Sequence, residues 1–405
     1  MSRGTVFNRG TKDRPNYTVI IERGRDPVTG QRRREWYPGF KSKKEAEQAR
    51  TRLLNDLDNG RYVEPTKLTL KELLDEWLEV TSTAVRASTH QSYEANVRLH
   101  IVPAIGGMRV QDLTPTHLNS LYKRLLVHGR ADGKGGLRPK TVRNIHICLH
   151  RALTYAVRTN LVVRNVASNA SPPRQPGFTG KEMRTWSAEQ LREFLMSVSQ
   201  HRYFAAYLLA ATTGMRRGEV LGLTWDDVDL DARTVSVRQT LLSINYKVQL
   251  SEPKTQRSKR CIALDAYTVA VLKEHRARQE KEHSPGAGQH QGNGFVFTTE
   301  EGLPVQPDNF SKLFDTAVKK SGLPRIRFHD LRHTAATLAL REGIHPKVVS
   351  ERLGHSTVSL TLDLYSHAIP ALQQEAADRL AALVFSDGWL QNGCNDSPEG
   401  SSEPS

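Results

Sequence analysis

Apolar residues with helical spacing are concentrated in a block that runs from about residue 68 to residue 167. Four segments of this block carry apolar side chains three and four positions apart: residues 69–80, 88–101, 116–127 and 140–159. This spacing places the apolar side chains on one face of an α-helix, so it predicts four helices that pack together. The block contains no catalytic constellation, and its glycine-rich loop 129–140 lacks the Gly-Lys-Ser/Thr ending of a Walker loop. We therefore expect a helical binding domain.

A strand pattern precedes this helical block. Residues 17–40 hold two strand-like stretches around the turn-forming segment Asp-Pro-Val-Thr-Gly, which predicts a strand, a turn and a second strand. Residues 41–60 then have the pattern of a helix that is capped by Ser42 and ended by Gly60. The N-terminal part of the chain is therefore expected to be a small sheet with one helix.

The block from about residue 184 to residue 385 alternates apolar helices with short polar motifs. Its apolar segment 203–213 is broken at Gly214, and a second helix is predicted to begin at Arg216. Arginine at the start of a helix is unfavourable with the helix dipole, so an anionic partner there would make sense. Glu219, one turn later, could orient the arginine. The plainer alternative is a surface arginine on an ordinary helix.

Three further residues of this block stand out more weakly. Residues 247–264 are predicted to form two strands around a turn, with Lys254 near the tip, where a lysine usually only keeps the hairpin soluble. His355 follows a glycine, and Tyr365 lies ten residues later. A single tyrosine is more often a packing residue whose hydroxyl is hydrogen-bonded.

The segment Arg-Phe-His-Asp-Leu-Arg-His, residues 327–333, gathers cationic and titratable side chains at the start of a predicted helix. At about 100° per residue, His329, Arg332 and His333 fall within an arc of roughly 100°. The apolar side chains fall on the opposite face, which we expect to pack into the core: Leu331, Ala335 and Leu338. On periodicity alone, the polar face is most simply a solvated surface.

Two functional alternatives exist for the same face. Histidines four positions apart can share a zinc ion, but Arg332 lies between them and would repel a cation. The sequence also offers no cysteine or carboxylate cluster to complete a ligand set, so we expect no metal. The other alternative is an anion site, because a guanidinium matches phosphate oxygens and a neighbouring histidine can move a proton.

Charge favours the anion site. The 405 residues carry a formal net charge of +15, and the isoelectric point is near 9.8, which indicates an anionic partner, most often nucleic acid. Residues 1–63 alone hold 15 Lys and Arg against 8 Asp and Glu. Their basic strands either bind DNA, through Arg32, Arg33 and Arg34, or form a solvated face.

Cysteine content and apolar runs bear on the compartment. The chain has three widely separated cysteines, which argues against a disulfide framework or a zinc site and for a reducing cytoplasm. No apolar signal core opens the sequence, and no apolar run approaches the roughly 20 residues of a membrane span. We expect a cytoplasmic protein with no membrane partner.

The C-terminal part of the chain holds a predicted helix and a predicted tail. In residues 369–385 an apolar stripe at helical spacing consists of Leu372, Ala376, Leu380 and Leu383. The stripe packs either on its own domain or on a neighbouring copy. Residues 386–405 contain four acids and no Lys or Arg, and we predict a disordered tail there.

Taken in order, the motifs resemble the tyrosine recombinase family, the phage-type integrases. The matching features are Thr-Gly-Met-Arg, a hairpin lysine, His-Asp-Leu-Arg-His, Leu-Gly-His and a tyrosine followed by Ser-His. The helical block resembles the core-binding domain of this family, and residues 1–63 resemble its arm-binding domain. Matched one by one, the family's catalytic positions fall on Arg216, Lys254, His329, Arg332, His355 and Tyr365. The lysine is the least distinctive match, because Lys259 is close by.

The resemblance implies a mechanism. Tyr365 would attack a DNA phosphodiester and form a 3′-phosphotyrosine, while Arg216 and Arg332 clamp the non-bridging oxygens and the two histidines add hydrogen bonds. His329 is placed to take the tyrosine proton, and Lys254 would give a proton to the departing 5′ oxygen. The chemistry implied needs no ATP, metal or other cofactor.

The resemblance also implies an architecture and partners. We expect a mainly α protein with small β-sheets, in which the two large domains clamp double-stranded DNA at attachment sites. The predicted domains are an arm-binding domain (1–63), a core-binding domain (66–167), a linker (168–183), a catalytic domain (184–385) and the tail (386–405). The predicted DNA-binding residues are Arg32, Arg33, Arg34, Lys140 and Arg143.

We expect the working form to be a homotetramer on DNA, helped by a directionality or host DNA-bending factor, in a bacterial cytoplasm near the nucleoid. The rival functions are a type IB topoisomerase, a recombinase that resolves dimers, and a DNA-binding regulator with a decayed active site. The basic N-terminal domain and the filled catalytic positions favour an integrase that inserts and excises a mobile element.

Overall fold

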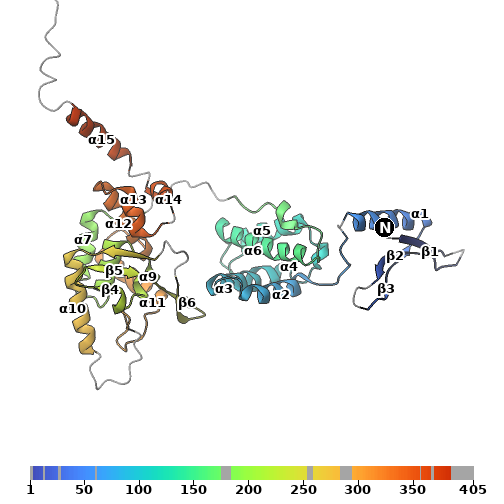
Figure 1. The fold of residues 1–405 in the computed structure, drawn as a ribbon, viewed down its shortest axis with the longest axis horizontal. Helices are drawn as coiled ribbons and strands as arrows, with labels where there is room; N and C mark the ends of the chain where they lie inside the picture. Colours follow the sequence, from blue (N-terminus) through green and yellow to red (C-terminus); the bar gives the residue numbers. More distant parts are fainter. Residues whose placement is uncertain are drawn as a thin grey trace, which may run out of the picture. The chain divides into compact units, whose positions relative to one another are not determined.

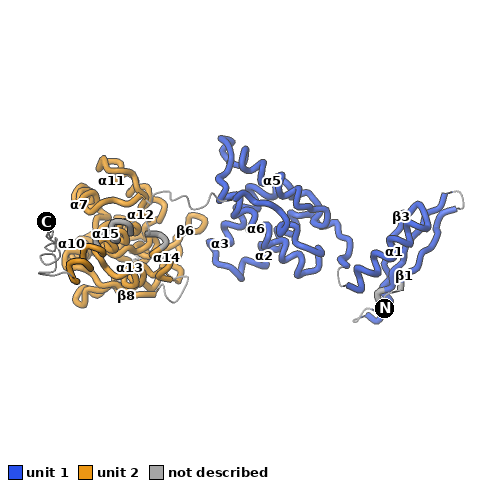
Figure 2. The backbone as a smooth tube through the Cα atoms, turned by 90° about the horizontal axis from the view of Figure 1, so that it is seen from above, with its two compact units in different colours: residues 1–179 blue, residues 180–405 orange. Residues whose placement is uncertain are grey.

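The computed structural model describes residues 3–11, 14–25, 29–59, 62–174, 184–252, 259–282, 294–355, 357–365 and 369–384. Only the backbone is described for residues 3, 23, 360, 363–365 and 369–376. The chain divides into two compact units, residues 1–179 and residues 180–405, which Figure 2 colours separately. The predicted tail 386–405 lies outside the described residues, as does the part of the predicted linker from residue 175 to residue 183.

The N-terminal part of the first unit is a three-stranded antiparallel sheet with one helix. Its elements are β1 (Arg3–Asn8), β2 (Tyr17–Arg25), β3 (Arg32–Phe40) and α1 (Lys43–Asp58). The predicted strands are β2 and β3, and β1 was not predicted. Ser42 caps α1 as predicted, because its hydroxyl accepts a hydrogen bond from the Glu45 backbone N–H. Val19, Ile21 and Ala46 form the centre of a small apolar core in this part of the chain.

The rest of the first unit is helical. Its elements are α2 (Leu70–Ser82), α3 (Ala87–Asn96), η1 (Val97–Ile101), α4 (Val102–Ile105), η2 (Val110–Asp112), α5 (Pro115–His128), α6 (Pro139–Arg158) and η3 (Val166–Asn169). All four predicted helices are present, and they bury a continuous apolar cluster. The second one differs in detail, because its last turn, η1, is a π-helix that the apolar spacing did not predict.

The second unit mixes helices with two small antiparallel sheets. Its helices are α7 (Ala188–Ser197), α8 (Phe204–Thr213), α9 (Arg217–Leu221), η4 (Trp225–Asp227), α10 (Ala266–Glu282), α11 (Pro307–Ser321), α12 (Phe328–Arg341), α13 (Pro346–Leu353), α14 (Val358–Tyr365) and α15 (Ile369–Val384). Its strands are β4 (Val228–Asp229), β5 (Thr234–Val237), β6 (Thr240–Ile244), β7 (Lys247–Ser251) and β8 (Arg260–Ala263). Figure 1 shows α12, α13 and α14 gathered together. The predicted mainly α fold with small sheets is confirmed.

The hairpin predicted over residues 247–264 is wrong in its pairing. The two strands exist, but β7 pairs with β6, and β8 pairs with β5 in the other sheet. The true hairpin turns at Asn245 and Tyr246, whose φ angles are 50° and 62°. A two-residue turn of this kind needs left-handed backbone at both positions, and a tyrosine there is an uncommon signal.

An aromatic cluster holds the helices of the second unit together. Phe194 of α7, Tyr207 of α8, Phe314 of α11 and Phe328 of α12 are buried and in ring contact. Because each ring comes from a different helix, the cluster fixes α12 against α7, α8 and α11. The polar motif at the start of α12 therefore stands on a rigid support.

No helix in the described ranges is both long enough and apolar enough to cross a membrane.

Candidate active site

The junction between α8 and α9 presents the first arginine of the site. Gly214 ends α8 with a φ of 68°, a left-handed conformation that glycine adopts without strain. A Cβ at this position would also overlap the side chain of Leu353, so α13 approaches the turn as closely as glycine permits. The turn places Arg216 at the N-cap of α9, where it was predicted.

Glu219 orients Arg216, as the sequence suggested. The Glu219 side chain is 3% exposed, and its Oε1 lies 2.7 Å from Nη1 of Arg216. Its Oε2 accepts a hydrogen bond of 2.9 Å from the Arg216 backbone N–H. Burial raises the pKa of Glu219, but hydrogen bonding and charge from Arg260, with the charge of Arg216, outweigh it and hold that pKa below its ordinary value. Glu219 is therefore an ionised carboxylate inside the protein.

The second arginine corrects the prediction for α12. Arg332 was expected on a polar face, but it is only 3% exposed, and its Nη1 donates a hydrogen bond of 2.8 Å to the Gly214 carbonyl. Of the predicted apolar face, Leu331 is buried, whereas Ala335 and Leu338 are only half-buried. The helix lies between α8, α11 and α13, so it is enclosed on several sides and periodicity alone could not separate its faces.

Three histidines lie close to the two arginines. The rings of His329 and His333 meet edge to face, with their centroids 5.1 Å apart. Desolvation lowers the pKa of His329 to about 4, and the charges of His333, Arg332 and Arg216 lower it further. His329 is thus a neutral imidazole near pH 7, which is the form that can accept a proton.

His355 reaches the same place from the turn after α13. Desolvation lowers its pKa to about 4, helped by the charges of Arg332, Arg216, His333 and Arg260. Its Nδ1 shares a hydrogen bond of 2.8 Å with the Thr361 hydroxyl, which fixes the orientation of the ring. His355 is neutral near pH 7 and can act as a hydrogen-bond donor or acceptor.

Four of the six predicted catalytic positions are thus neighbours. Arg216 donates from Nη2 to the Gly354 carbonyl over 3.3 Å, which ties the α8–α9 junction to the turn that carries His355. Arg332 is hydrogen-bonded to the same junction through the Gly214 carbonyl. The charges of both arginines lower the pKa of His329 and that of His355. Segments more than 100 residues apart in the sequence therefore present two guanidiniums and two imidazoles together.

The other two predicted positions are described less fully. Lys254 lies outside the described residues. Its rival Lys259 is described, and its Nζ lies 3.5 Å from Oε2 of Glu252. Tyr365 is the last residue of α14, and only its backbone is described.

The predicted DNA-binding residues lie in the first unit. Arg32, Arg33 and Arg34 are exposed on β3, where Arg34 forms an ion pair of 3.0 Å with Glu22. Lys140 and Arg143 are exposed near the start of α6.

Sequence reasoning missed Arg260, which lies at the start of β8. Its Nη2 is 2.8 Å from Oε2 of Glu219, so this carboxylate is shared by Arg216 and Arg260. The residue follows three other cationic positions in a basic stretch, and no local pattern distinguished it from a surface arginine. The structure shows that its side chain turns inward, because it is 7% exposed and contacts Glu219.

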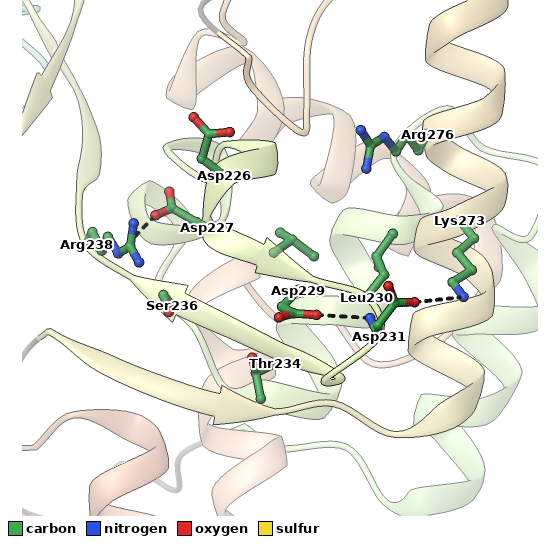
Figure 3. Close-up of a pocket in the computed structure, with 11 residues that line it drawn as sticks. Asp226, Asp227, Asp229, Leu230, Asp231, Thr234, Ser236, Arg238, Lys273 and Arg276 are labelled. Atoms are coloured by element: carbon green, nitrogen blue, oxygen red, sulfur yellow. Dashed lines mark hydrogen bonds and ion pairs between the residues drawn. The ribbon is translucent and has the colours of Figure 1, made fainter.

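A hollow elsewhere in the second unit has the wrong charge for DNA. Its volume is about 610 Å³, and four aspartates line it: Asp226, Asp227, Asp229 and Asp231. Figure 3 shows ion pairs between Asp227 and Arg238 and between Asp231 and Lys273. None of the four predicted catalytic positions whose side chains are described lines this hollow. Its four aspartates outnumber the three cationic residues that also line it, Arg238, Lys273 and Arg276, so the hollow disfavours phosphate.

Three segments of the chain match known protein families in sequence. Residues 181–371 match the Phage integrase family, residues 69–126 match the phage integrase N-terminal SAM-like domain, and residues 8–57 match an Arm DNA-binding domain. A tyrosine recombinase XerC-like protein of Caldanaerobacter subterraneus is 30% identical over 402 residues, which cover 95% of this chain and 100% of that protein. The ICEBs1 integrase of Bacillus subtilis is 27% identical over 370 residues, 91% of this chain and 97% of that protein.

Solved structures share the fold. The Tn1549 transposon integrase in complex with transposon right end DNA has a TM-score of 0.63 at 23% identity and covers 78% of this chain and 100% of its own. A lambda integrase tetramer bound to a Holliday junction has a TM-score of 0.54 at 17% identity, with coverage of 89% and 94%. With its three matched segments and its full-length relative, the chain belongs to the tyrosine recombinase family of phage-type integrases and is a site-specific DNA recombinase.

Proposed function

We propose that this recombinase breaks DNA by attack of the Tyr365 hydroxyl on a phosphodiester held by Arg216, Arg332, His329 and His355. The observation that carries the proposal is the convergence of these two guanidiniums and two neutral imidazoles from three separate segments. A pentacoordinate phosphorus spreads negative charge over its non-bridging oxygens, and preorganised cationic donors stabilise that charge. Tyr365 ends the helix that follows the His355 turn, so the chain brings it to this region.

The Tyr365 oxygen bonds to phosphorus while its proton passes to neutral His329, and the bond from phosphorus to the 5′ oxygen breaks. Lys254 gives a proton to that leaving oxygen. The product is a 3′-phosphotyrosine that conserves the bond, so a second 5′ hydroxyl can reseal the strand by the reverse route without ATP.

Covalent capture tests this proposal. Attachment-site DNA, identified by sequencing the junctions of the encoding element, is nicked next to the cleavage site so that the leaving fragment diffuses away. We expect a protein–DNA adduct that survives detergent and forms at the same rate in EDTA, because the arginines carry the charge that a metal carries in other phosphoryl-transfer enzymes. Loss of the adduct in EDTA, with recovery on adding magnesium or zinc, would contradict this mechanism.

The rival functions give other results in the same experiment. A regulator with a decayed site forms no adduct. A topoisomerase forms one, but it relaxes supercoiled plasmid and does not join two attachment sites. Joining of two sites on separate DNA molecules identifies the integration reaction, and recombination restricted to two sites on one molecule identifies dimer resolution.

We also propose three functional domains with the predicted limits: arm-binding (1–63), core-binding (66–167) and catalytic (184–385). The last two close around double-stranded DNA, with Lys140 and Arg143 on phosphates. In the arm-binding domain, exposed arginines on β3 face DNA phosphates or a groove, and exposed Trp36, with Arg9 4.4 Å from its ring, extends that surface.

Deleting residues 1–63 is expected to lower recombination more than cleavage of the core site. The deletion removes a net charge of +7 and the arm contacts but leaves the cleavage groups in place. A control that keeps the fold replaces exposed Arg32 and Arg33 with Gln and should weaken arm-site binding in gel shifts, with a smaller salt dependence. If the truncated protein integrates as well as the whole chain, the arm-binding role is wrong.

A homotetramer is the proposed working assembly, because joining two duplexes requires four cut strands and each chain has one Tyr365. The means of linking protomers is α15. Its side chains from residue 377 to residue 384 are exposed, with Leu380 and Leu383 exposed by 62% and 78%. Because these apolar side chains are not buried against their own domain, we infer that they pack on a neighbouring copy of the chain.

Truncation after Ile369 is therefore expected to leave DNA binding intact and to disrupt synapsis and strand exchange. Light scattering should find the parent tetrameric on paired sites and the truncated chain unable to reach that state. A matched control replaces Leu380 and Leu383 with Ser and retains the length of the chain. Normal tetramers and normal recombination by both variants would show that α15 only closes its own domain.

The remaining part of the proposal concerns the setting. The protein works in a bacterial cytoplasm at the nucleoid, with a directionality or DNA-bending factor that selects integration or excision. Reconstitution with purified components tests this. Efficient recombination in both directions by the recombinase alone would exclude such a factor.

A further inference from the structure

Arg260 is a buried cation that touches both sides of the candidate active site. Its side chain is 7% exposed, and Nη2 and Nη1 lie 2.8 Å and 3.3 Å from the two carboxylate oxygens of Glu219. Its Nε donates a hydrogen bond of 2.6 Å to the carbonyl of Arg352, at the end of α13. A Cβ on Gly354 would lie 2.9 Å from Arg260 Nη1, so the guanidinium packs directly on the turn before His355.

The charges around Glu219 require a second cation. Glu219 is an ionised, buried carboxylate 2.7 Å from Arg216. An isolated ion pair of Arg216 and Glu219 has no net charge, and the carboxylate of Glu219 would compete with a phosphate for the guanidinium of Arg216. With Arg260 on the other side of the carboxylate, the three groups together carry one positive charge.

Exposure shows where that positive charge is available. The side chain of Arg216 is 39% exposed, whereas those of Glu219 and Arg260 are 3% and 7% exposed. Arg260 therefore cannot itself bind a phosphate in solution without a rearrangement, but Arg216 can. The buried cation offsets the buried anion, and the exposed cation keeps its charge for a ligand.

We propose that Arg260 is a positioning residue that neutralises Glu219, so that Arg216 remains a net cation toward the scissile phosphate. This inference rests on the proposed role of Arg216 as a phosphate-binding residue. In the same position Arg260 holds the end of α13 and so places the His355 turn beside Arg216. One residue of β8 thereby adjusts both the charge and the geometry of the site.

A second mutation that restores the net charge of the group tests the inference. Arg260→Met removes the buried cation and retains an apolar side chain of similar length. We expect single-turnover formation of the covalent adduct to fall about 10- to 100-fold, the range observed when groups that orient metal-site ligands are removed. Adding Glu219→Gln should restore a large part of that loss, because the double variant again leaves Arg216 with one net positive charge. The glutamine also keeps an oxygen that can accept from Arg216.

Two other variants separate charge balance from loss of structure. Arg260→Lys keeps the charge and should cleave much faster than Arg260→Met. Arg202→Met is the matched control, because Arg202 forms a half-buried ion pair of 2.8 Å with Glu282 at the other end of α8 from Gly214. It should change thermal stability and leave the cleavage rate near that of the parent. Gel shifts and melting temperatures confirm that each variant is folded.

The outcomes are distinct. Cleavage by Arg260→Met at the parental rate overturns the inference, and so does a folded double variant that is no faster than the single one. If Arg260→Met does not fold, the double variant Arg260→Met, Glu219→Gln decides alone. Cleavage by the double variant supports the inference, and a double variant that is folded but inactive overturns it. The proposed function has its own test, since normal cleavage by Arg216→Ala would remove the phosphate-binding role on which this inference rests.

Discussion

Replacing Tyr365 with Phe should abolish covalent attachment to DNA while leaving DNA binding near that of the parent. The change removes one oxygen, which is the proposed nucleophile, and retains the aromatic ring. A phenyl ring has no atom that can bond to phosphorus, so no slower version of the same step remains. The measurement is capture of a detergent-resistant adduct on nicked attachment-site DNA, with gel shifts on the same DNA to follow binding.

Two other tyrosines of the second unit provide controls. Tyr246 and Tyr267 are 94% and 63% exposed, so either could reach DNA by accident. Their Phe variants should form the adduct at the parental rate. An adduct that persists in Tyr365→Phe and disappears in one of these variants would show that the nucleophile has been wrongly assigned.

Arg332→Ala is expected to slow cleavage by at least roughly 10²-fold, the scale of losing one preorganised donor to a developing oxyanion. The same is expected of Arg216→Ala. The two variants should differ in stability, because Arg332 is 3% exposed and donates to the Gly214 carbonyl, whereas the Arg216 side chain is 39% exposed. Arg332→Ala leaves a cavity and breaks a hydrogen bond between two buried groups, whereas the side chain lost in Arg216→Ala is partly exposed, so the melting temperature of Arg332→Ala should fall further.

The neighbouring residue Arg217 is the control for both variants. Its Nη1 donates to the hydroxyl of Ser311 over 2.7 Å and pairs with Asp308, so it faces α11 and not the site. Arg217→Ala should bind and cleave DNA nearly as the parent does. Quenched-flow or manual sampling of the adduct gives the rates, and parental rates for Arg216→Ala or Arg332→Ala would mean that the arginine is not part of the phosphate clamp.

Local patterns in the sequence were enough for several elements. The spacing of apolar residues predicted the four main helices of the first unit, and Ser42 predicted the start of α1. Gly214 predicted the break between α8 and α9, and the i to i+3 spacing predicted that Glu219 reaches Arg216. Each of these features depends on residues within one or two turns, where propensity and spacing determine the geometry.

Other features depend on partners that are distant in the sequence. The strand after Lys254, β8, was predicted to pair with β7 in one hairpin. The turn at Asn245 and Tyr246 instead pairs β7 with β6, and β8 pairs with β5 in the other sheet. The burial of Arg332 depends on the Gly214 carbonyl, 118 residues away. Helical periodicity contains no information about what covers the opposite face.

The sequence by itself determined the family, the set of candidate catalytic residues and most helices, because motif order, residue type and local spacing are written in the chain. Only the tertiary structure decided that Arg216, Arg332, His329 and His355 are neighbours, and that Glu219 is shared by Arg216 and by Arg260, which lies 41 positions further along the chain. The physical reason is that a charge in a protein takes its properties from whatever surrounds it. Burial, a second guanidinium and a shared carboxylate are set by packing between distant segments, and no local pattern encodes them.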